Sequence, residues 1–290
     1  YTEVRTTPLT DGILAEINLG AVDFQNNFDG SMQEPIYLPG PLPILLLNGS
    51  TGIAVGMAAD LPSHNARETA DAVIAYIKNN DISVKEILEH LNGPDLPTGG
   101  QIINSKEHIL KCYETGRGNL HVRARWEVEH LSHGQWRIKI TELPHDLNPK
   151  KILQLVADAS VYEAPKDKDP NQKMLDLKQY IKLNIDDIKD ITSKDDPDGA
   201  SIMIIEPKVA RNVEPEAFME GVISMLGLQS TLKFNLTAVS TDLFPRQRHI
   251  KEIIADWVGF RRLTITKRTQ TRLNKIIDRL ELVKGRLSIM

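Results

Sequence analysis

The chain has 290 residues, 41% of them hydrophobic and 26% charged, which indicates one large or two medium globular domains. This composition excludes a largely disordered or collagen-like protein. The single cysteine, Cys112, excludes an intramolecular disulfide and a cysteine-rich zinc module, and it is typical of a reducing compartment. The net charge of −4 argues only mildly against a nucleic-acid partner.

Both ends of the sequence have the features of a chain cut from a longer one. The sequence begins at Tyr1 without a basic-then-apolar leader, and it ends at Met290 within a predicted helix. We therefore expect a fragment of a longer protein.

One stretch is long enough to be mistaken for a membrane span. Residues 35–59 carry no charge, and these 25 residues exceed the roughly 20 that cross a bilayer. Four prolines divide the first half, and Asn48-Gly49-Ser50-Thr51-Gly52 interrupts the second. Because such a sequence cannot hold a continuous helix, we predict no membrane insertion.

The first third of the chain mixes strand and helix signals. Residues 1–12 alternate loosely and predict a short strand, whereas Leu9 to Leu19 carry a helical spacing of apolar residues. Residues 32–62, rich in proline and glycine, predict loop and a short buried strand.

Two capping patterns predict the next helices. Asn65 with Glu68 predicts a helix whose apolar face is Val73, Ile74 and Ile77. Ser83 with Glu86 repeats the pattern and predicts a helix to Leu91.

The middle of the chain predicts antiparallel strands among helices. Residues 120–129 and 135–142 flank Ser132-His133-Gly134 and predict an antiparallel pair, and residues 163–173 predict an exposed polar insertion. Further predicted elements are helices over 149–158 and 214–226 and a buried strand over 201–206. The mixture indicates the α+β class.

The C-terminal segment is basic and helical. Residues 246–286 hold 12 Lys or Arg against 4 Asp or Glu, a local charge of +8. A helix over about 248–290 would be roughly 60 Å long. Its apolar residues step by 3 and 4, which predicts a coiled-coil seam: Leu273, Ile276, Leu280, Val283 and Leu287. The alternative is an ordinary long helix with a solvated charged face.

Several familiar kinds of site are excluded. No GxxxxGK[ST] phosphate loop is present, and Gly116-Arg117-Gly118 lacks the third glycine of a dinucleotide fingerprint. The acidic stretch 195–199 fails as a calcium loop, because Lys194 stands where the first carboxylate should be. Cys112 with His121, His130 and His133 matches no standard zinc spacing.

Residues 45–58 pack apolar residues around small polar ones. From the residues alone, this segment is either a buried turn in a core or a place where glycines let the backbone approach a ligand closely.

The segment Asn48-Gly49-Ser50-Thr51-Gly52-Ile53-Ala54-Val55-Gly56-Met57-Ala58 resembles the most characteristic motif of the A subunits of bacterial type IIA topoisomerases. Tyr1-Thr2-Glu3-Val4-Arg5 resembles the segment around their catalytic tyrosine. Further motifs follow in the family's order: Val22-Asp23-Phe24, Asn27-Phe28-Asp29-Gly30, Pro62-Ser63-His64-Asn65, the stretch 93–100, and Gly116-Arg117-Gly118. The resemblance covers nearly the whole chain.

Within that family the topoisomerase IV branch is favoured over gyrase, on Leu45-Leu46-Leu47-Asn48-Gly49 and the strand that contains Trp126. Residues 159–180 resemble an insertion relative to the commoner pattern. The resemblance implies three parts: the tail of a winged-helix domain (1–36), an α/β tower domain (37–245), and the first coiled-coil helix toward the exit gate (246–290).

The resemblance also implies the chemistry. The Tyr1 hydroxyl attacks a DNA phosphate and forms a 5′-phosphotyrosyl link, two subunits cut both strands, a second duplex passes, and the break is resealed. A phenolate is both a nucleophile and a fair leaving group, so the step is reversible. In the family an arginine that precedes the tyrosine assists, with Mg²⁺ held by the partner subunit; that arginine would precede Tyr1. We therefore expect the 290-residue chain alone not to cleave DNA.

The implied DNA contacts are Ile53, Asn48, Gly49, Ser50 and Arg5, and DNA binding should weaken steeply with salt. Ile53 would wedge between base pairs and bend the duplex. From the residues alone, the alternative is that Ile53 belongs to the core.

The implied partners are double-stranded DNA and the topoisomerase IV B subunit, which binds ATP and the metal. The assembly would be a homodimer of the A subunit within an A2B2 heterotetramer, cytoplasmic and associated with the bacterial nucleoid. Two other functions stay open: the gyrase A subunit, and a non-catalytic coiled-coil protein that organises chromosomes. A covalent DNA adduct that is lost in Tyr1→Phe would exclude the second of these.

Overall fold

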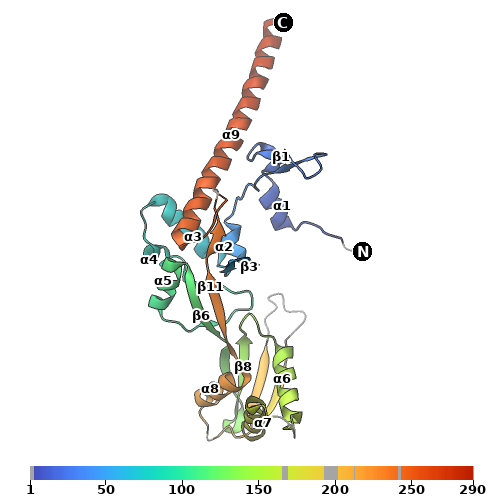
Figure 1. Ribbon diagram of the computed structural model, residues 1–290, viewed down its shortest axis with the longest axis vertical. Helices are drawn as coiled ribbons and strands as arrows, with labels where there is room; N and C mark the ends of the chain where they lie inside the picture. Colours follow the sequence, from blue (N-terminus) through green and yellow to red (C-terminus); the bar gives the residue numbers. More distant parts are fainter. Residues whose placement is uncertain (1–2, 165–168, 193–201, 212, 241–242, 290) are drawn as a thin grey trace. The chain divides into compact units, whose positions relative to one another are not determined.

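The computed structural model describes residues 3–164, 169–192, 202–211, 213–240 and 243–289 (Figure 1). Helices and strands are mixed along the chain, and eight strand pairs among the described residues are antiparallel, which is consistent with the α+β mixture. The chain divides into two compact units, each described by itself. The first comprises residues 1–92, 113–116 and 236–290, and the second comprises residues 93–112 and 117–235.

The first unit begins its regular structure with a helix. Helix α1 spans Pro8–Leu14, and the Thr7 hydroxyl accepts a hydrogen bond from the Thr10 amide at 3.3 Å. Proline at the first helical position has a fixed φ that suits a helix start, and its missing N–H costs nothing there. The strand predicted over residues 1–12 is therefore wrong. A 3-10 turn, η1 (Ile17–Leu19), and the hairpin of β1 (Phe24–Asn26) and β2 (Gln33–Pro35) follow.

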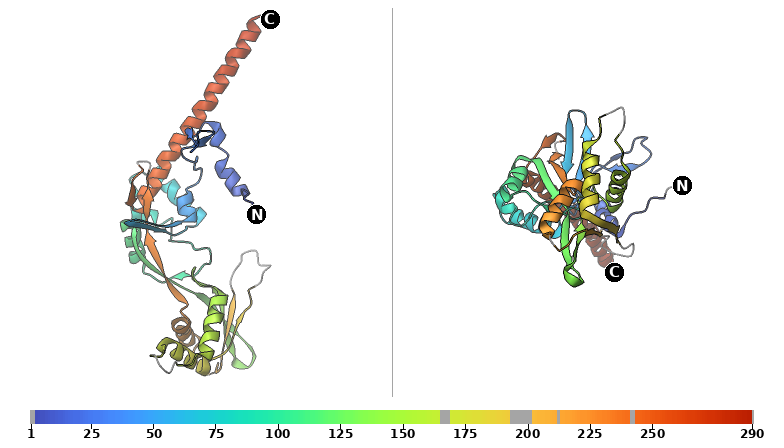
Figure 2. Two further views of the ribbon diagram at one scale, coloured as in Figure 1. Left: turned by 45° about the vertical axis from the view of Figure 1, so that its right-hand side comes forward. Right: turned by 90° about the horizontal axis from the view of Figure 1, so that it is seen from below.

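This N-terminal segment is bound to the long helix α9 (Ile250–Ile289) through Glu16. The Arg261 guanidinium donates two hydrogen bonds to the Glu16 carboxylate, at 2.5 and 2.8 Å, and Arg268 donates another. Nearby, Lys267 Nζ lies 2.5 Å from Asp23 Oδ2. Both views in Figure 2 place this segment beside the red helix. The hydrogen bond from Arg261 lowers the pKa of Glu16 below its ordinary value of 4.5.

Glu16→Gln is expected to lower the free energy of unfolding by roughly 1.5–3 kcal/mol near neutral pH, because it removes charge-assisted hydrogen bonds from two partly buried arginines. Since the folded-state pKa is depressed, this stabilisation is present above the ordinary value of 4.5 and is lost as the pH falls through the lower folded value. Denaturant unfolding at pH 7 and in a series below pH 4.5 measures it. The difference between the variant and the parent should shrink with acidification.

Glu3→Gln is the matched control. Glu3 also pairs with an arginine, Arg5, at 3.0 Å, but both side chains are 81% exposed, and exposed pairs contribute little. Equal stability losses in Glu3→Gln and Glu16→Gln would contradict the assignment of the anchor to Glu16.

The core of the first unit lies around helix α3 (Ala66–Lys78) and the start of α9. Asn65 caps α3 as predicted, through bonds to the amides of Arg67 and Glu68. The predicted apolar face is only partly right: Val73 is buried, whereas Ile74 and Ile77 are each 48% exposed. Other buried members of this core are Leu46, Leu61, Ala72, Ile82, Ile87, Leu91, Tyr113, Ile250, Ile253, Ile254 and Val258.

The second predicted helix of this region is short. Ser83 and Glu86 form the predicted capping box, but helix α4 ends at Ile87 rather than Leu91 (Val84–Ile87). Turns that follow carry Leu91 into the core, where it is fully buried. A short two-stranded pair, β12 (Thr237–Val239) with β13 (Pro245–Gln247), leads into α9.

In the second unit, the strand predicted over 120–129 is two strands. Strand β6 (Arg117–Arg123) pairs with β11 (Gln229–Asn235) and with β5 (Gln101–Ile102), whereas β7 (Arg125–His130) pairs with β8 (Trp136–Glu142). The break falls at Ala124, which is 1% exposed and whose amide donates to the Leu228 carbonyl at 3.0 Å. Before Ala124 the chain pairs with β11 and β5, and after it the chain pairs with β8. The predicted antiparallel pairing across Ser132-His133-Gly134 is confirmed.

A four-stranded sheet, in the order β7-β8-β10-β9, forms the rest of this unit, with β9 at Ile185–Asp190 and β10 at Met203–Pro207. Every second residue of β8 is buried, from Trp136 to Ile140, in a core shared with the helices. On β8, Arg137 pairs with Glu129 and Glu206 of neighbouring strands, so this sheet has one apolar and one charged side. The helices are α5 (Lys106–Thr115), whose last residues belong to the first unit, α6 (Pro149–Val161), α7 (Gln172–Asn184) and α8 (Pro215–Leu226).

The predicted exposed insertion, residues 163–173, lies within the stretch 159–180. Its described residues between 163 and 173 are exposed as predicted, but α7 begins at Gln172 and buries Leu177 in the core. The acidic stretch 195–199 and Ser201, the first residue of the predicted strand 201–206, lie outside the described residues.

The predicted apolar seam lies on the exposed part of α9. Its five residues, Leu273, Ile276, Leu280, Val283 and Leu287, are between 41% and 65% exposed. The predicted helix over about 248–290 is confirmed, since α9 begins at Ile250, two residues after the predicted start. Across the described residues, no helix combines the length and the apolar character needed to cross a membrane.

Candidate nucleic-acid interface

The last part of the uncharged segment 35–59 lies in a hairpin. Strand β3 (Ser50–Ala54) pairs antiparallel with β4 (Met57–Leu61), in a register that places Ala54 opposite Met57. Val55 and Gly56 make the turn, and Gly56 has φ of +81°, a conformation that glycine adopts without a Cβ penalty. Glycine therefore permits a two-residue turn at this point.

The hairpin's first strand is exposed along its whole length, whereas β4 is partly buried and ends on the buried Leu61, so the short buried strand predicted within residues 32–62 is only partly right. Ile53 is 95% exposed and Val55 is fully exposed at the turn. The alternative that Ile53 is a core residue is therefore contradicted. A stiff apolar side chain held in solvent on a strand is available for contact with a partner.

Helix α2 (Ile44–Asn48) forms the base of the hairpin. Leu46 anchors it in the core at 1% exposed, and Asn48, the last helical residue, is exposed. Because Gly49 and Ser50 follow directly, the structure places Asn48, Gly49, Ser50 and Ile53 along one continuous segment. Four of the five predicted DNA contacts therefore lie within residues 48–53, a proximity that follows from the sequence alone.

Gly49 occupies a backbone conformation that other residues avoid. Its φ of 70° and ψ of 178° lie in a region that is essentially restricted to glycine. A Cβ there would lie 2.5 Å from the Leu61 carbonyl oxygen and 2.9 Å from the Ser63 amide nitrogen. Both neighbours are backbone atoms and cannot move aside as a side chain would.

Gly49→Ala is therefore expected to lower the free energy of unfolding by at least about 1–3 kcal/mol, the cost of the strained backbone alone. Gly52→Ala is the matched control, since a Cβ at Gly52 meets nothing within 4 Å. Thermal unfolding of the two variants measures the difference. A Gly49→Ala variant as stable as Gly52→Ala would contradict this account of the hairpin base.

A buried histidine stands behind α2, and sequence reasoning assigned it no role. His64 is 4% exposed, and its ring contacts the Leu46 carbonyl oxygen and the Tyr113 hydroxyl. The only signal in the sequence was the motif Pro62-Ser63-His64-Asn65.

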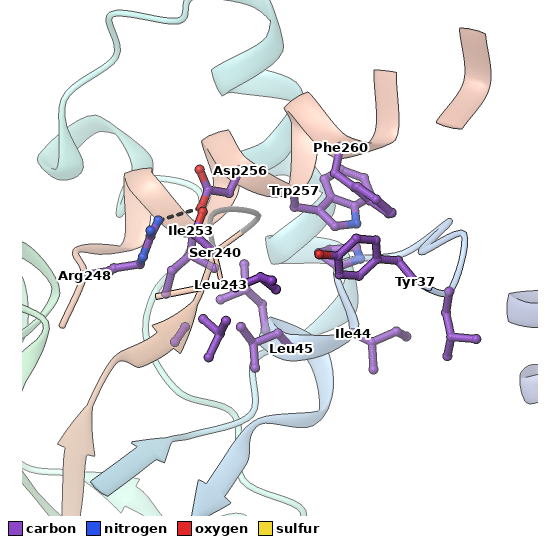
Figure 3. A pocket seen from close by; sticks show the side chains of 15 residues that line it. Tyr37, Ile44, Leu45, Ser240, Leu243, Arg248, Ile253, Asp256, Trp257 and Phe260 are labelled. Atoms are coloured by element: carbon purple, nitrogen blue, oxygen red, sulfur yellow. Dashed lines mark hydrogen bonds and ion pairs between the residues drawn. The ribbon is translucent and has the colours of Figure 1, made fainter. Parts of the chain in front are cut away.

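On another side of α2, an apolar cavity of about 420 Å³ lies against the start of α9 (Figure 3). Trp257 Nε1 donates to the Gly40 carbonyl at 3.1 Å, and Tyr37 meets Phe260 edge to face. At the cavity's polar end, Arg248 donates to Asp256 at 2.6 Å. The contacts of Trp257 and Phe260 attach the segment before α2 to α9 and so support the base of the hairpin.

The remaining predicted site residues lie on the N-terminal segment. Tyr1 lies outside the described residues. Arg5 is exposed and forms its ion pair with Glu3, two residues away, so this contact is local to that segment.

The described residues do not provide a metal centre. Among them, no group of three or more His, Cys, Asp or Glu side chains could hold a metal ion. Cys112, which the sequence placed near three histidines, is buried, and burial raises the pKa of its thiol.

The family model for the A subunits of DNA gyrase and topoisomerase IV matches residues 1–290, the whole chain. The chain belongs to this family.

Among curated relatives, it is 39% identical over 291 residues to the A subunit of DNA topoisomerase 4 from Neisseria gonorrhoeae, covering all of this chain and 37% of the relative. It is 36% identical to the protein of that name from Haemophilus influenzae and 34% identical to that from Escherichia coli. Those matches cover 98% and 99% of this chain and 35% of each relative. The chain thus spans little more than a third of the length of these relatives.

Proposed function

We propose that this protein is the DNA cleavage and religation subunit of a type IIA topoisomerase, an isomerase that passes one duplex through a transient double-strand break in another. The observation that carries the proposal is the family match over all 290 residues. The exposed hairpin supports it, because β3, which carries Ser50 and Ile53, is exposed along its whole length and Asn48 and Gly49 directly precede it.

Tyr1 is the proposed nucleophile. Its phenolic oxygen attacks a phosphorus of the DNA backbone, the bond from that phosphorus to the 3′ oxygen breaks, and the 3′ hydroxyl leaves. The phenol gives up its proton, which requires help near neutral pH because its ordinary pKa is near 10. The reverse attack by the 3′ hydroxyl reseals the strand and frees the tyrosine, so the break needs no external energy source.

The hairpin is the proposed site of DNA bending. Ile53, stiff at χ1 and free of contacts that would hold it in a core, would enter a base step and partly unstack it. Asn48 and the backbone of Gly49 and Ser50 would contact the duplex beside it. Arg5 would contribute a charge toward a phosphate.

The proposed domain assignment has three parts. Residues 1–36 would be the tail of a winged-helix domain, residues 37–245 the tower domain, and residues 246–290 the first coiled-coil helix toward the exit gate. The apolar seam exposed on α9 supports the last of these, because a helix with that spacing packs against a partner helix.

The proposed assembly is a homodimer of this subunit within an A2B2 heterotetramer, acting on double-stranded DNA at the bacterial nucleoid in the cytoplasm. The B subunit would bind ATP and hold Mg²⁺. When bound, that Mg²⁺ would stabilise negative charge on the phosphate oxygens during cleavage and resealing.

Between the two enzymes of the family, we favour topoisomerase IV, which decatenates and relaxes DNA. The curated relatives from Neisseria, Haemophilus and Escherichia are topoisomerase 4 A subunits, and the family model covers both enzymes. Gyrase would be favoured instead if the assembled enzyme introduced negative supercoils. A non-catalytic chromosome-organising protein is the other alternative, and the basic helix alone would permit it.

The test is to trap the covalent intermediate. The A subunit that carries this sequence is assembled with its B subunit, incubated with plasmid and Mg²⁺, and denatured rapidly. The expected result is linear DNA linked to protein at its 5′ ends, with mass spectrometry locating the nucleotide on the peptide that contains Tyr1. DNA bound tightly but never linked would favour the non-catalytic alternative.

A further inference from the structure

His64 lies behind the DNA-facing segment and contacts it from the protein interior. It follows β4, is 4% exposed, and contacts helix α2. Both ring nitrogens have partners: Nδ1 lies 3.0 Å from the Leu46 carbonyl oxygen, and Nε2 lies 2.6 Å from the Tyr113 hydroxyl.

These contacts determine the tautomer of a neutral imidazole. A carbonyl oxygen can only accept, so Nδ1 must carry the proton and donate to Leu46. Nε2 is then the acceptor, and the Tyr113 hydroxyl donates to it. The result is a chain of two hydrogen bonds that runs from Tyr113 through His64 to the backbone of α2.

The carbonyl that His64 contacts belongs to the end of a helix. Helix α2 has only five residues, and the carbonyls of a last turn have no partners within their own helix. His64 supplies two donors to the Leu46 carbonyl, its ring Nδ1–H and its backbone amide at 2.9 Å. These donors fix the turn that presents Asn48.

The same short segment also supports the next residue. The backbone of Gly49 packs so closely on Leu61 and Ser63 that a Cβ would lie 2.5 Å from one and 2.9 Å from the other. The stretch from Leu61 to His64 therefore holds both the end of α2 and the start of β3. The position of Asn48, Gly49 and Ser50 depends on it.

We propose that His64, oriented by Tyr113, is a positioning residue for DNA binding: it acts through the Leu46 carbonyl to hold Asn48, Gly49 and Ser50 in the geometry that receives the duplex. This inference rests on the proposed DNA contact of those three residues. It assigns the buried pair a role in substrate binding beyond its contribution to the core.

The experiment compares variants of His64 whose side-chain N–H donors lie at different distances from the backbone. In His64→Asn, the amide nitrogen stands where Nδ1 stood and can still donate to Leu46, whereas in His64→Gln the amide lies one carbon further out. We expect duplex affinity of the assembled enzyme to fall about tenfold in His64→Ala and His64→Gln, the effect of losing roughly one well-placed hydrogen bond, and to recover in His64→Asn. Tyr113→Phe should give a smaller loss, because it removes the orienting bond alone.

Controls separate positioning from stability. Ile87→Ala empties a fully buried site on α4, so it should lower the melting temperature without changing the DNA affinity of the folded enzyme. His90→Ala, at an exposed histidine, should change neither. If His64→Ala does not fold, the comparison of His64→Asn with His64→Gln decides.

Two failures can be told apart with Asn48→Ala. If Asn48→Ala weakens DNA binding while the folded His64 variants bind like the parent, the positioning role is wrong and the DNA site stands. If Asn48→Ala has no effect either, the proposed DNA site itself is wrong. Equal affinities in His64→Asn and His64→Gln would also overturn the proposal.

Discussion

Tyr1→Phe is expected to abolish covalent DNA cleavage by the assembled enzyme while leaving DNA binding close to that of the parent. Phenylalanine keeps the aromatic ring but has no oxygen to form the phosphotyrosyl bond, so no residual nucleophile remains at that position. The measurement is the yield of protein-linked DNA after denaturation, together with duplex affinity in a binding assay. We expect the adduct to fall below detection.

Tyr76→Phe is the matched control, because it also removes a tyrosine hydroxyl. Tyr76 lies on helix α3. The Tyr76→Phe variant should cleave DNA at the parent rate. Adduct formation that survives in Tyr1→Phe would show that another residue is the nucleophile and would overturn the proposed chemistry.

Ile53→Ala is expected to leave stability almost unchanged and to reduce DNA bending and cleavage. A side chain that is 95% exposed gives up little buried area on truncation, so the change in free energy of unfolding should stay within about 0.5 kcal/mol. In the proposed complex the same truncation removes the wedge that holds a base step open. Bending measured by fluorescence energy transfer across a labelled duplex, and cleavage yield, should both fall.

Ile254→Ala provides the contrast in stability. Ile254 lies on α9 at 1% exposed, and truncating it should cost roughly 2–5 kcal/mol. If Ile53→Ala bent and cleaved DNA normally, the wedge would be wrong even though the exposure of Ile53 stands.

Local signals accounted for the elements whose stabilising contacts lie close in sequence. Asn65 caps α3, Ser83 and Glu86 form their capping box, and α9 runs almost the predicted length. Each depends on contacts between residues a few positions apart, so spacing along the chain is sufficient to find them.

One error falls where a distant contact overrides a local pattern. The strand signal over 120–129 is continuous, but the carbonyl of Leu228, 104 residues further along the chain, accepts a hydrogen bond from the Ala124 amide, and the strand divides there. Helix α7 was missed although Met174, Leu177 and Ile181 recur at helical spacing, because the polar residues that precede them favoured an exposed insertion.

The sequence by itself determined the α+β mixture and, through its ordered motifs, the family to which this chain belongs. It also singled out the segment from Asn48 to Ala58. Whether that segment was core or surface was decided only by the tertiary structure. Apolar composition is the same in both cases, and only the pairing of β3 with β4, without a layer over Ile53, shows that the side chain is exposed. The anchors at Glu16 and His64 are likewise tertiary, because each joins residues that lie far apart in the sequence, and no local pattern encodes such a pairing.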